Sequence, residues 1–183
     1  RPEDIDFVKY KRFTDRLEAN SNLNAEHLKM SNLEKYIRDF TTVYNRSWSI
    51  HNHFVPLSEE RVSNLFAEMR PILREDLLWF LYDGDEPIGF YLSILDLNQV
   101  FKHLGGNMNW WGKLKFMYYL KTTKIDKIRG LIFGVVPKYQ NKGVYSIMIM
   151  KMYDVVRRDP HIKSTELAWI GDFNPKMHAL FSS

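Results

Sequence analysis

The sequence predicts an α/β fold of three layers, in which a mixed central sheet is flanked by helices. Three observations indicate this class. Segments with helical spacing of apolar residues alternate along the chain with short apolar segments typical of strands. The segment RGLIFGVV at 129–136 lacks polar alternation, which is typical of a strand covered on both faces. A turn and an apolar helix follow it directly, and strands joined through helices favour a layered arrangement.

The chain before the first predicted strand divides into an arm and two helices. Residues 1–30 are polar and rich in Asn, Lys and Arg, and we expect a connecting arm. Ser31-Asn32-Leu33-Glu34 is typical of a capping box, which starts a helix by giving free backbone N–H groups two side-chain acceptors. Ser58 begins a second pattern of this kind, and that helix is predicted to end near Pro71. The domain is therefore expected to cover 31–183.

The rest of the chain continues the alternation. Two apolar segments around the turn DGDE at 83–86 predict a β-hairpin. An insert follows, with a helical segment that ends at Gly105-Gly106 and an aromatic, basic segment that is helical in part. The overall order is α-α-β-β-(insert)-β-α-β-α. The expected ranges are strands 77–82 and 87–95, insert 97–127, strand 129–136, helix 143–158, strand 165–170 and a last helix opened by Asn174-Pro175.

Composition bounds the function. The 183 residues include no cysteine, which excludes disulfides, thiolate metal sites and a cysteine nucleophile, and favours a reducing, cytoplasmic setting. No apolar run approaches the ~18 residues of a membrane span. The net charge of +4 suits an anionic ligand and is small for a nucleic-acid-binding protein. Because the chain begins without Met and ends soon after a predicted helix start, we expect a fragment truncated at its C-terminal end.

The segment GVVPKYQNKGVYSIMI at 134–149 carries the clearest functional signal. A strand, a glycine-containing loop and a helix direct backbone N–H groups and the positive end of the helix dipole into one space. Gly143 permits close approach to the backbone, Lys142 adds a charge, and Gln140 and Asn141 add donors. These features predict a phosphate or pyrophosphate site, and an ordinary strand-to-helix turn is the alternative. Neither common nucleotide-binding fingerprint is present.

Segment 135–149 resembles the pyrophosphate-binding signature of the GNAT superfamily of acyl-CoA-dependent N-acyltransferases. That signature reads Gln/Arg-x-x-Gly-x-Gly/Ala after a strand, and here it is Gln140-Asn141-Lys142-Gly143-Val144-Tyr145. Segment 166–181 is similar to the family's next strand and helix, with Asn174 at the asparagine often near the cofactor. The segments YNRSW and FVPLSEE, at 44–48 and 54–60, and the insert are similar to a less characterised bacterial branch of the superfamily.

The resemblance covers roughly 33–181 and implies an enzyme that moves an acetyl or other acyl group from acyl-CoA to an amine. It implies that backbone at the end of the 129–136 strand holds the pantetheine arm and polarises the thioester carbonyl. Members of the branch tend to carry another acyltransferase-like region upstream, so that region or a homodimer is the expected partner, besides the small-molecule or peptide amine. The implied cofactor-binding residues are Gly134, Val135, Val136, Gln140, Asn141, Lys142, Gly143, Val144, Tyr145 and Asn174.

Two departures from the family pattern bear on activity. Tyr145 stands where Gly or Ala is usual, and Phe181 stands where many members carry a tyrosine that protonates the leaving thiolate. The expected alternative is therefore a non-catalytic module that binds acyl-CoA or a partner protein. No catalytic residue is assigned, because each candidate base also has an ordinary structural role available. These candidates are Asp96, Glu166, Asp172 and His178.

Two further features have simpler interpretations. His51 and His53 stand two residues apart, so on a strand they point to opposite faces, and no metal site is expected. Segment 109–129 mixes aromatic and basic residues, and its apolar stripe is expected to pack on the domain with lysine stems outside. The alternatives are a lid over the acceptor site or a contact with an anionic surface, either nucleic acid or membrane. The stripe consists of Trp110, Trp111, Leu114, Met117 and Tyr118.

Overall fold

A five-stranded mixed sheet forms the middle layer of the computed structural model, which describes residues 7–19, 21–49, 54–106 and 109–166. The strand order follows the chain, and neighbouring strands are antiparallel except for the parallel pair β4–β5. The expected mixed sheet flanked by helices is thereby confirmed. The strands are β1 (Leu23–His27), β2 (Leu78–Asp83), β3 (Glu86–Leu95), β4 (Lys127–Val135) and β5 (Ser164–Glu166).

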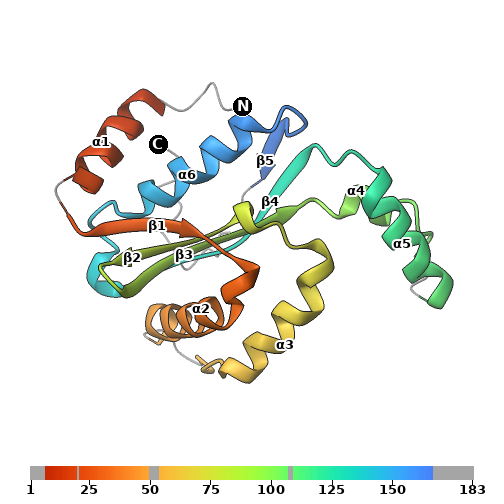
Figure 1. The fold of residues 1–183 in the computed structure, drawn as a ribbon, viewed down its shortest axis with the longest axis horizontal. Helices are drawn as coiled ribbons and strands as arrows, with labels where there is room; N and C mark the ends of the chain where they lie inside the picture. The colour runs from red at the N-terminus through yellow and green to blue at the C-terminus, as the bar shows by residue number, and fades with distance from the viewer. Residues whose placement is uncertain (1–6, 20, 50–53, 107–108, 167–183) are drawn as a thin grey trace.

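Helices cover both faces of this sheet (Figure 1). One face carries α2 and α3, the other carries α1 and α6, and α4 and α5 project beyond one end of the sheet (Figure 1). The α-helices are α1 (Phe7–Ala19), α2 (Leu33–Trp48), α3 (Glu59–Met69), α4 (Asn98–Phe101), α5 (Trp110–Thr122) and α6 (Tyr145–Arg158). Short 3-10 turns are η2 (Met30–Asn32), η3 (Arg70–Ile72), η4 (Glu75–Leu77) and η5 (Pro137–Tyr139).

Two local expectations near the N-terminus are wrong. The segment expected to be a connecting arm contains α1 and the edge strand β1, whose residues pair from Leu23 with Asp83 to His27 with Trp79. As an edge strand with one buried residue, Ala25, it carries no apolar alternation to reveal it. The capping box at Ser31 does not form, because η2 leads into α2 and Asn32 is the N-cap, without a side-chain bond. The domain boundary at residue 31 stays a prediction.

Other expectations are confirmed. The Ser58 hydroxyl accepts a hydrogen bond from the Arg61 N–H at 3.2 Å and starts α3. Strands β2 and β3 form the expected hairpin around Gly84. Aromatic pairs hold α2 on the sheet: the ring centroids of Tyr36 and Phe80 lie 5.0 Å apart, and those of Phe40 and Phe90 lie 4.6 Å apart. On the other face, the spacing of apolar residues in α6 buries Ile147 and Met148 completely.

An ion pair joins the end of α6 to the segment before β2. The Arg74 Nη1 lies 2.9 Å from the Asp159 Oδ2, and Arg74 also pairs with Asp76 at 2.8 Å. The hydrogen bond from Arg74 lowers the pKa of Asp159 below its ordinary value. The carboxylate therefore stabilises the fold above the ordinary aspartate pKa of about 3.9, and this contribution is lost as pH falls through the lowered value.

Replacing Asp159 with asparagine is expected to lower the free energy of unfolding near neutral pH by less than about 1 kcal/mol, because the pair is partly exposed. The asparagine keeps the acceptor for the His161 N–H, so the loss isolates the ionic pair. Urea unfolding at a series of pH values checks this, and the difference from wild type should vanish at the acidic end. Asp154→Asn, in the preceding helix α6, is the matched control, and an equal loss at every pH would contradict the prediction.

Candidate functional site

The turn between β4 and α6 has the geometry of an anion cradle. Gly143 has φ +68°, in the left-handed region that favours glycine. Within the part of the chain that the structure describes, the backbone N–H groups of Asn141, Gly143 and Val144 have no hydrogen-bond acceptor. These donors stand at the N-terminus of α6, where the helix dipole is positive. Free donors and a positive dipole end at one place favour a bound phosphate.

Two of the expected donors in this turn have different roles. The Gln140 side-chain amide donates to the Val135 carbonyl oxygen at 3.0 Å, so it holds the turn against the end of β4. The Lys142 ammonium is 4.9 Å from the centre of the Tyr139 ring and remains exposed. Tyr139 is itself buried, and its hydroxyl donates to Asp83. The geometry therefore leaves Lys142 as a cation available to a ligand, while Gln140 supports the backbone at the start of the turn.

Tyr145, the bulky residue at the sixth signature position, is turned toward the sheet. Its ring meets the Phe133 ring edge-on, with centroids 6.5 Å apart. Phe133 in turn meets Tyr91 of β3 with centroids 5.8 Å apart. The three rings form an aromatic row across β3 and β4, next to the cradle. Tyr145 thus lines the side of the turn that faces the sheet.

The sequence analysis missed a contact from α1. The Phe13 ring lies against Gly143, and a Cβ placed on Gly143 would be 2.7 Å from two of its ring carbons. Side-chain contacts hold α1 to α6: the Thr14 and Ser146 hydroxyls are 3.3 Å apart, and Lys151 pairs with Glu18 at 3.1 Å. The Phe13 side chain is still 44% exposed, so it borders the cradle from the solvent side. Its one signal in the sequence is an apolar residue within the weakly helical patch at 7–17.

The residues expected to hold the pantetheine arm lie directly before this turn. Gly134 pairs with Phe90 of β3, and the Val136 N–H donates to the Ile88 carbonyl at 2.9 Å. The structure therefore brings 134–136 and 140–145 together at the end of β4. Asn174 lies outside the described residues, as do Phe181 and the two histidines at 51 and 53.

Both described base candidates are bound to cations. Asp96 is buried, accepts from the Asn98 N–H at 3.2 Å, and faces the Arg129 Nε at 3.7 Å. Glu166 pairs with Lys127 and with Arg129, and the hydrogen bond from Lys127 lowers its pKa. A carboxylate with a lowered pKa is a weaker base. The other candidates, Asp172 and His178, lie outside the described residues.

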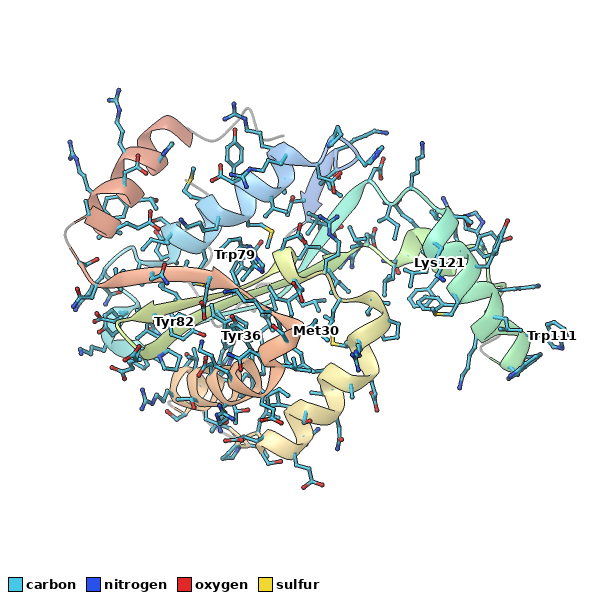
Figure 2. All side chains as sticks on the ribbon, in the orientation of Figure 1. Met30, Tyr36, Trp79, Tyr82, Trp111 and Lys121 are labelled. Carbon is cyan, nitrogen blue, oxygen red and sulfur yellow. The ribbon has the colours of Figure 1, made fainter. Side chains whose placement is uncertain are left out.

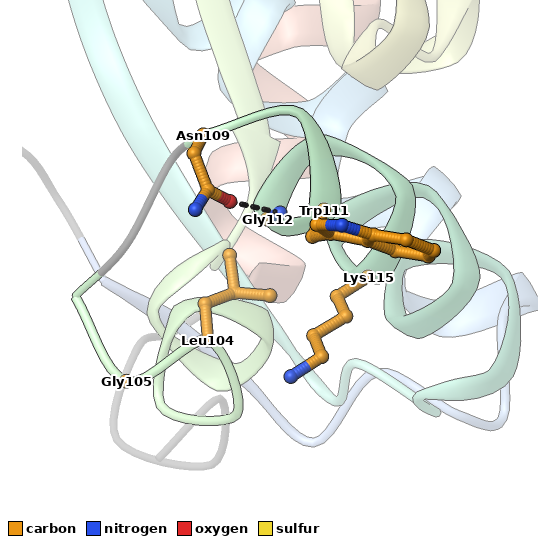
Figure 3. Close-up of a pocket in the computed structure, with 6 residues that line it drawn as sticks. All are labelled: Leu104, Gly105, Asn109, Trp111, Gly112 and Lys115. Atoms are coloured by element: carbon orange, nitrogen blue, oxygen red, sulfur yellow. Dashed lines mark hydrogen bonds between the residues drawn. The ribbon is translucent and has the colours of Figure 1, made fainter.

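The expectation that the α5 stripe packs on the domain is wrong. Trp110 and Trp111 are each 66% exposed, and Gly112 is the one buried residue in α5. The helix instead rests on α4 through its opposite side. A pocket lies at its base, where the Asn109 side chain accepts from the Gly112 N–H (Figure 3). The pocket is lined by Leu104, Gly105, Asn109, Trp111, Gly112 and Lys115.

Comparison with known proteins gives distant relatives. No family model matches the chain. Protein YghO of Escherichia coli is 21% identical over 140 residues, which are 74% of this chain and 36% of that protein. The bacterial ceramide synthase of Caulobacter vibrioides is 22% identical over 160 residues, 86% of this chain and 42% of that protein. The match thus spans about two fifths of these curated relatives. No helix in the described ranges is long and apolar enough to cross a membrane.

Solved structures resemble the fold. An acetyltransferase from Thermus thermophilus aligns with TM-score 0.56 and 15% identity, over 87% of this chain and 83% of that chain. The ribosomal-protein-S18-alanine N-acetyltransferase from Escherichia coli aligns with TM-score 0.52 and 15% identity, over 87% of this chain and 74% of that chain. The GphF GNAT-like decarboxylase in complex with isobutyryl-CoA aligns with TM-score 0.51 and 14% identity, over 86% of this chain and 71% of that chain. At these identities the likeness is evidence about the fold.

Proposed function

We propose that this chain, which has the fold of the GNAT acyltransferases, binds an acyl-CoA at the β4–α6 turn and transfers its acyl group to an amine. The observation that carries the proposal is that the N–H groups of Asn141, Gly143 and Val144 have no acceptor among the described residues and stand beside the exposed Lys142. A pyrophosphate presents oxygen acceptors and negative charge to such a cradle. That a protein of this fold has been seen with isobutyryl-CoA also supports the ligand class.

The cradle sets the direction of the cofactor. With the pyrophosphate at 140–145, the pantetheine arm runs along the end of β4 at 134–136. The family resemblance assigns Asn174 to the same arm. Backbone groups there stabilise the thioester oxygen as it gains charge. The neutral amine attacks the carbonyl carbon, the carbon–sulfur bond breaks, CoA leaves as its thiolate, and the nitrogen releases a proton. An amide and free CoA are the products.

Similar proteins bear on the choice of acyl group and of acceptor. Acetyltransferases among the structural neighbours favour a short acyl group. One relative is named as a ceramide synthase, and ceramide is an N-acylated lipid. The proposal therefore includes long acyl chains and long-chain amines. A second function, a non-catalytic module that binds acyl-CoA or a partner protein, is favoured by Tyr145 and Phe181, which both depart from the family pattern.

Binding is tested by thermal melting of the protein with free CoA, acetyl-CoA and acyl-CoAs of increasing length. A ligand at about 100 times its dissociation constant stabilises the fold by ~2.7 kcal/mol. For a chain of this size, we expect the melting temperature to rise by roughly 5–10 °C. Release of the CoA thiol on addition of short and long-chain amines then tests transfer. A rise without thiol release indicates the binding module, and no rise with any CoA contradicts both.

A further inference from the structure

Residues 97–125 hold all of the net positive charge of the protein. This segment contains five lysines and one histidine and no acidic residue. The whole chain has 26 basic and 22 acidic side chains, so outside this segment the acidic residues outnumber the basic ones by one. The segment includes α4 and α5, which project beyond the end of the sheet (Figure 1). A local field of one sign on a projecting element is a feature of binding surfaces for anions.

The α5 helix has apolar side chains on two opposite sides. One side packs on α4: Phe116 stacks on Phe101 with centroids 5.6 Å apart, and Tyr119 stacks on His103 with centroids 4.7 Å apart. The other side is open to solvent and is called the α5 face below. It consists of Trp110, Trp111, Leu114, Met117 and Tyr118, of which the least exposed, Met117, is 40% exposed.

Lysines border and interrupt this face. At 3.6 residues per turn, the five apolar side chains share an arc of about a third of the helix circumference. Lys113 and Lys115 lie at its two edges, and Lys121 lies within it. Figure 2 places Trp111 at the outer end of the helix and Lys121 toward the body. All three lysines are exposed, and the structure pairs none of them with a carboxylate in the described residues.

We propose that the α5 face docks on the surface of an anionic lipid bilayer. Tryptophan and tyrosine favour the interface between headgroups and acyl chains, where an apolar ring meets water. A helix lying in that plane buries its apolar side, and lysines at its edges reach the lipid phosphates with their stems against the acyl boundary. The pocket beside the face, toward which Lys115 extends, adds room for a headgroup (Figure 3). This inference does not depend on the proposed acyl transfer.

Two other occupants fit less well. A single-stranded nucleic acid stacks its bases on aromatic rings, but the same face has the non-aromatic Leu114 at its middle and Met117 at one edge. A second copy of the chain, packed through the same face, would bring two sets of lysines together without a carboxylate between them.

Vesicle co-sedimentation of the purified protein tests the proposal. Vesicles of phosphatidylcholine with phosphatidylglycerol should bind the protein, vesicles of phosphatidylcholine alone should bind it weakly, and added salt should reduce binding. Tryptophan fluorescence should shift to shorter wavelength on binding. Because each lysine near an anionic membrane contributes about fivefold, Lys113→Gln with Lys115→Gln should weaken binding about 25-fold. Trp110→Ala with Trp111→Ala should weaken it about tenfold or more.

The matched control neutralises two exposed basic residues away from the face, Lys29→Gln with Arg38→Gln, and should bind like wild type. Circular dichroism and the melting temperature check that each variant is folded. We expect the tryptophan variant to fold, because both tryptophan side chains are exposed. No binding to anionic vesicles by the folded wild type overturns the proposal. So does equal weakening in the control pair, tighter binding to a single-stranded oligonucleotide than to vesicles, or a dimer in size-exclusion chromatography that the tryptophan variant abolishes.

Discussion

Replacing Gly134 with valine is expected to lower the free energy of unfolding by about 3 kcal/mol, the upper end of the usual cost of overpacking a core. A Cβ at this position would lie 2.7 Å from the Cζ3 of Trp48 and 2.9 Å from the Cζ of Phe90. The two rings are stacked, with centroids 6.0 Å apart. The strand cannot retreat, because Gly134 pairs with Phe90 on β3. Urea unfolding followed by circular dichroism measures the loss.

A double-mutant cycle separates this clash from a general cost of losing glycine. Trp48→Leu removes the nearest ring atoms, so the double variant with Gly134→Val should be more stable than the sum of the two single changes predicts. We expect a coupling of about 1 kcal/mol or more in favour of the pair. Strict additivity would mean that the indole of Trp48 is not what excludes a larger side chain at position 134.

The parts of the fold that the sequence predicts are those in which each element carries its own signal. The hairpin of β2 and β3 has two apolar segments and a turn with Gly84, and α6 has apolar residues at helical spacing after an apolar strand. The edge strand β1 has no such signal, because its backbone pairs with β2 while four of its five side chains remain partly or fully exposed. The strand becomes recognisable only from its pairing with β2 in the structure.

The candidate site was predictable in the same partial way. Its backbone follows from local sequence, since a glycine and a helix start determine where the N–H groups point at Gly143 and Val144. Its surroundings come from distant residues. Phe13 reaches the turn from α1, and the Tyr145 ring contacts Phe133 of β4, so neither contact follows from the signature itself.

The error on α5 has a similar cause. Helical spacing shows which residues share a side of a helix, and Trp110, Leu114 and Met117 do share one. Spacing does not show which side is covered when apolar residues occur on both. In the structure, α4 covers the side with Phe116 and leaves the stripe in solvent. A stripe on an inserted helix can therefore be a surface for a partner.

Gly143→Asp is expected to abolish the melting-temperature rise with acyl-CoA, because its carboxylate stands at the cradle. The carboxylate accepts from the free N–H groups next to it and repels the pyrophosphate. We expect affinity for CoA to fall by more than about a hundredfold, since each lost charge-assisted hydrogen bond to the anion is worth ~1.5–3 kcal/mol. Some stability is lost as well, because the left-handed φ and the Phe13 ring both disfavour a Cβ.

The matched control is Gly105→Asp, after α4. Gly105 has φ +60°, close to that of Gly143, and a Cβ there meets nothing within 4 Å. The control therefore introduces the same side chain and charge in a similar backbone conformation, at the other end of the sheet from the cradle (Figure 1). It should lose stability on its own and keep the full rise with acyl-CoA. If both variants keep the rise, CoA binds away from this turn, and if both lose it, the effect is one of stability or net charge.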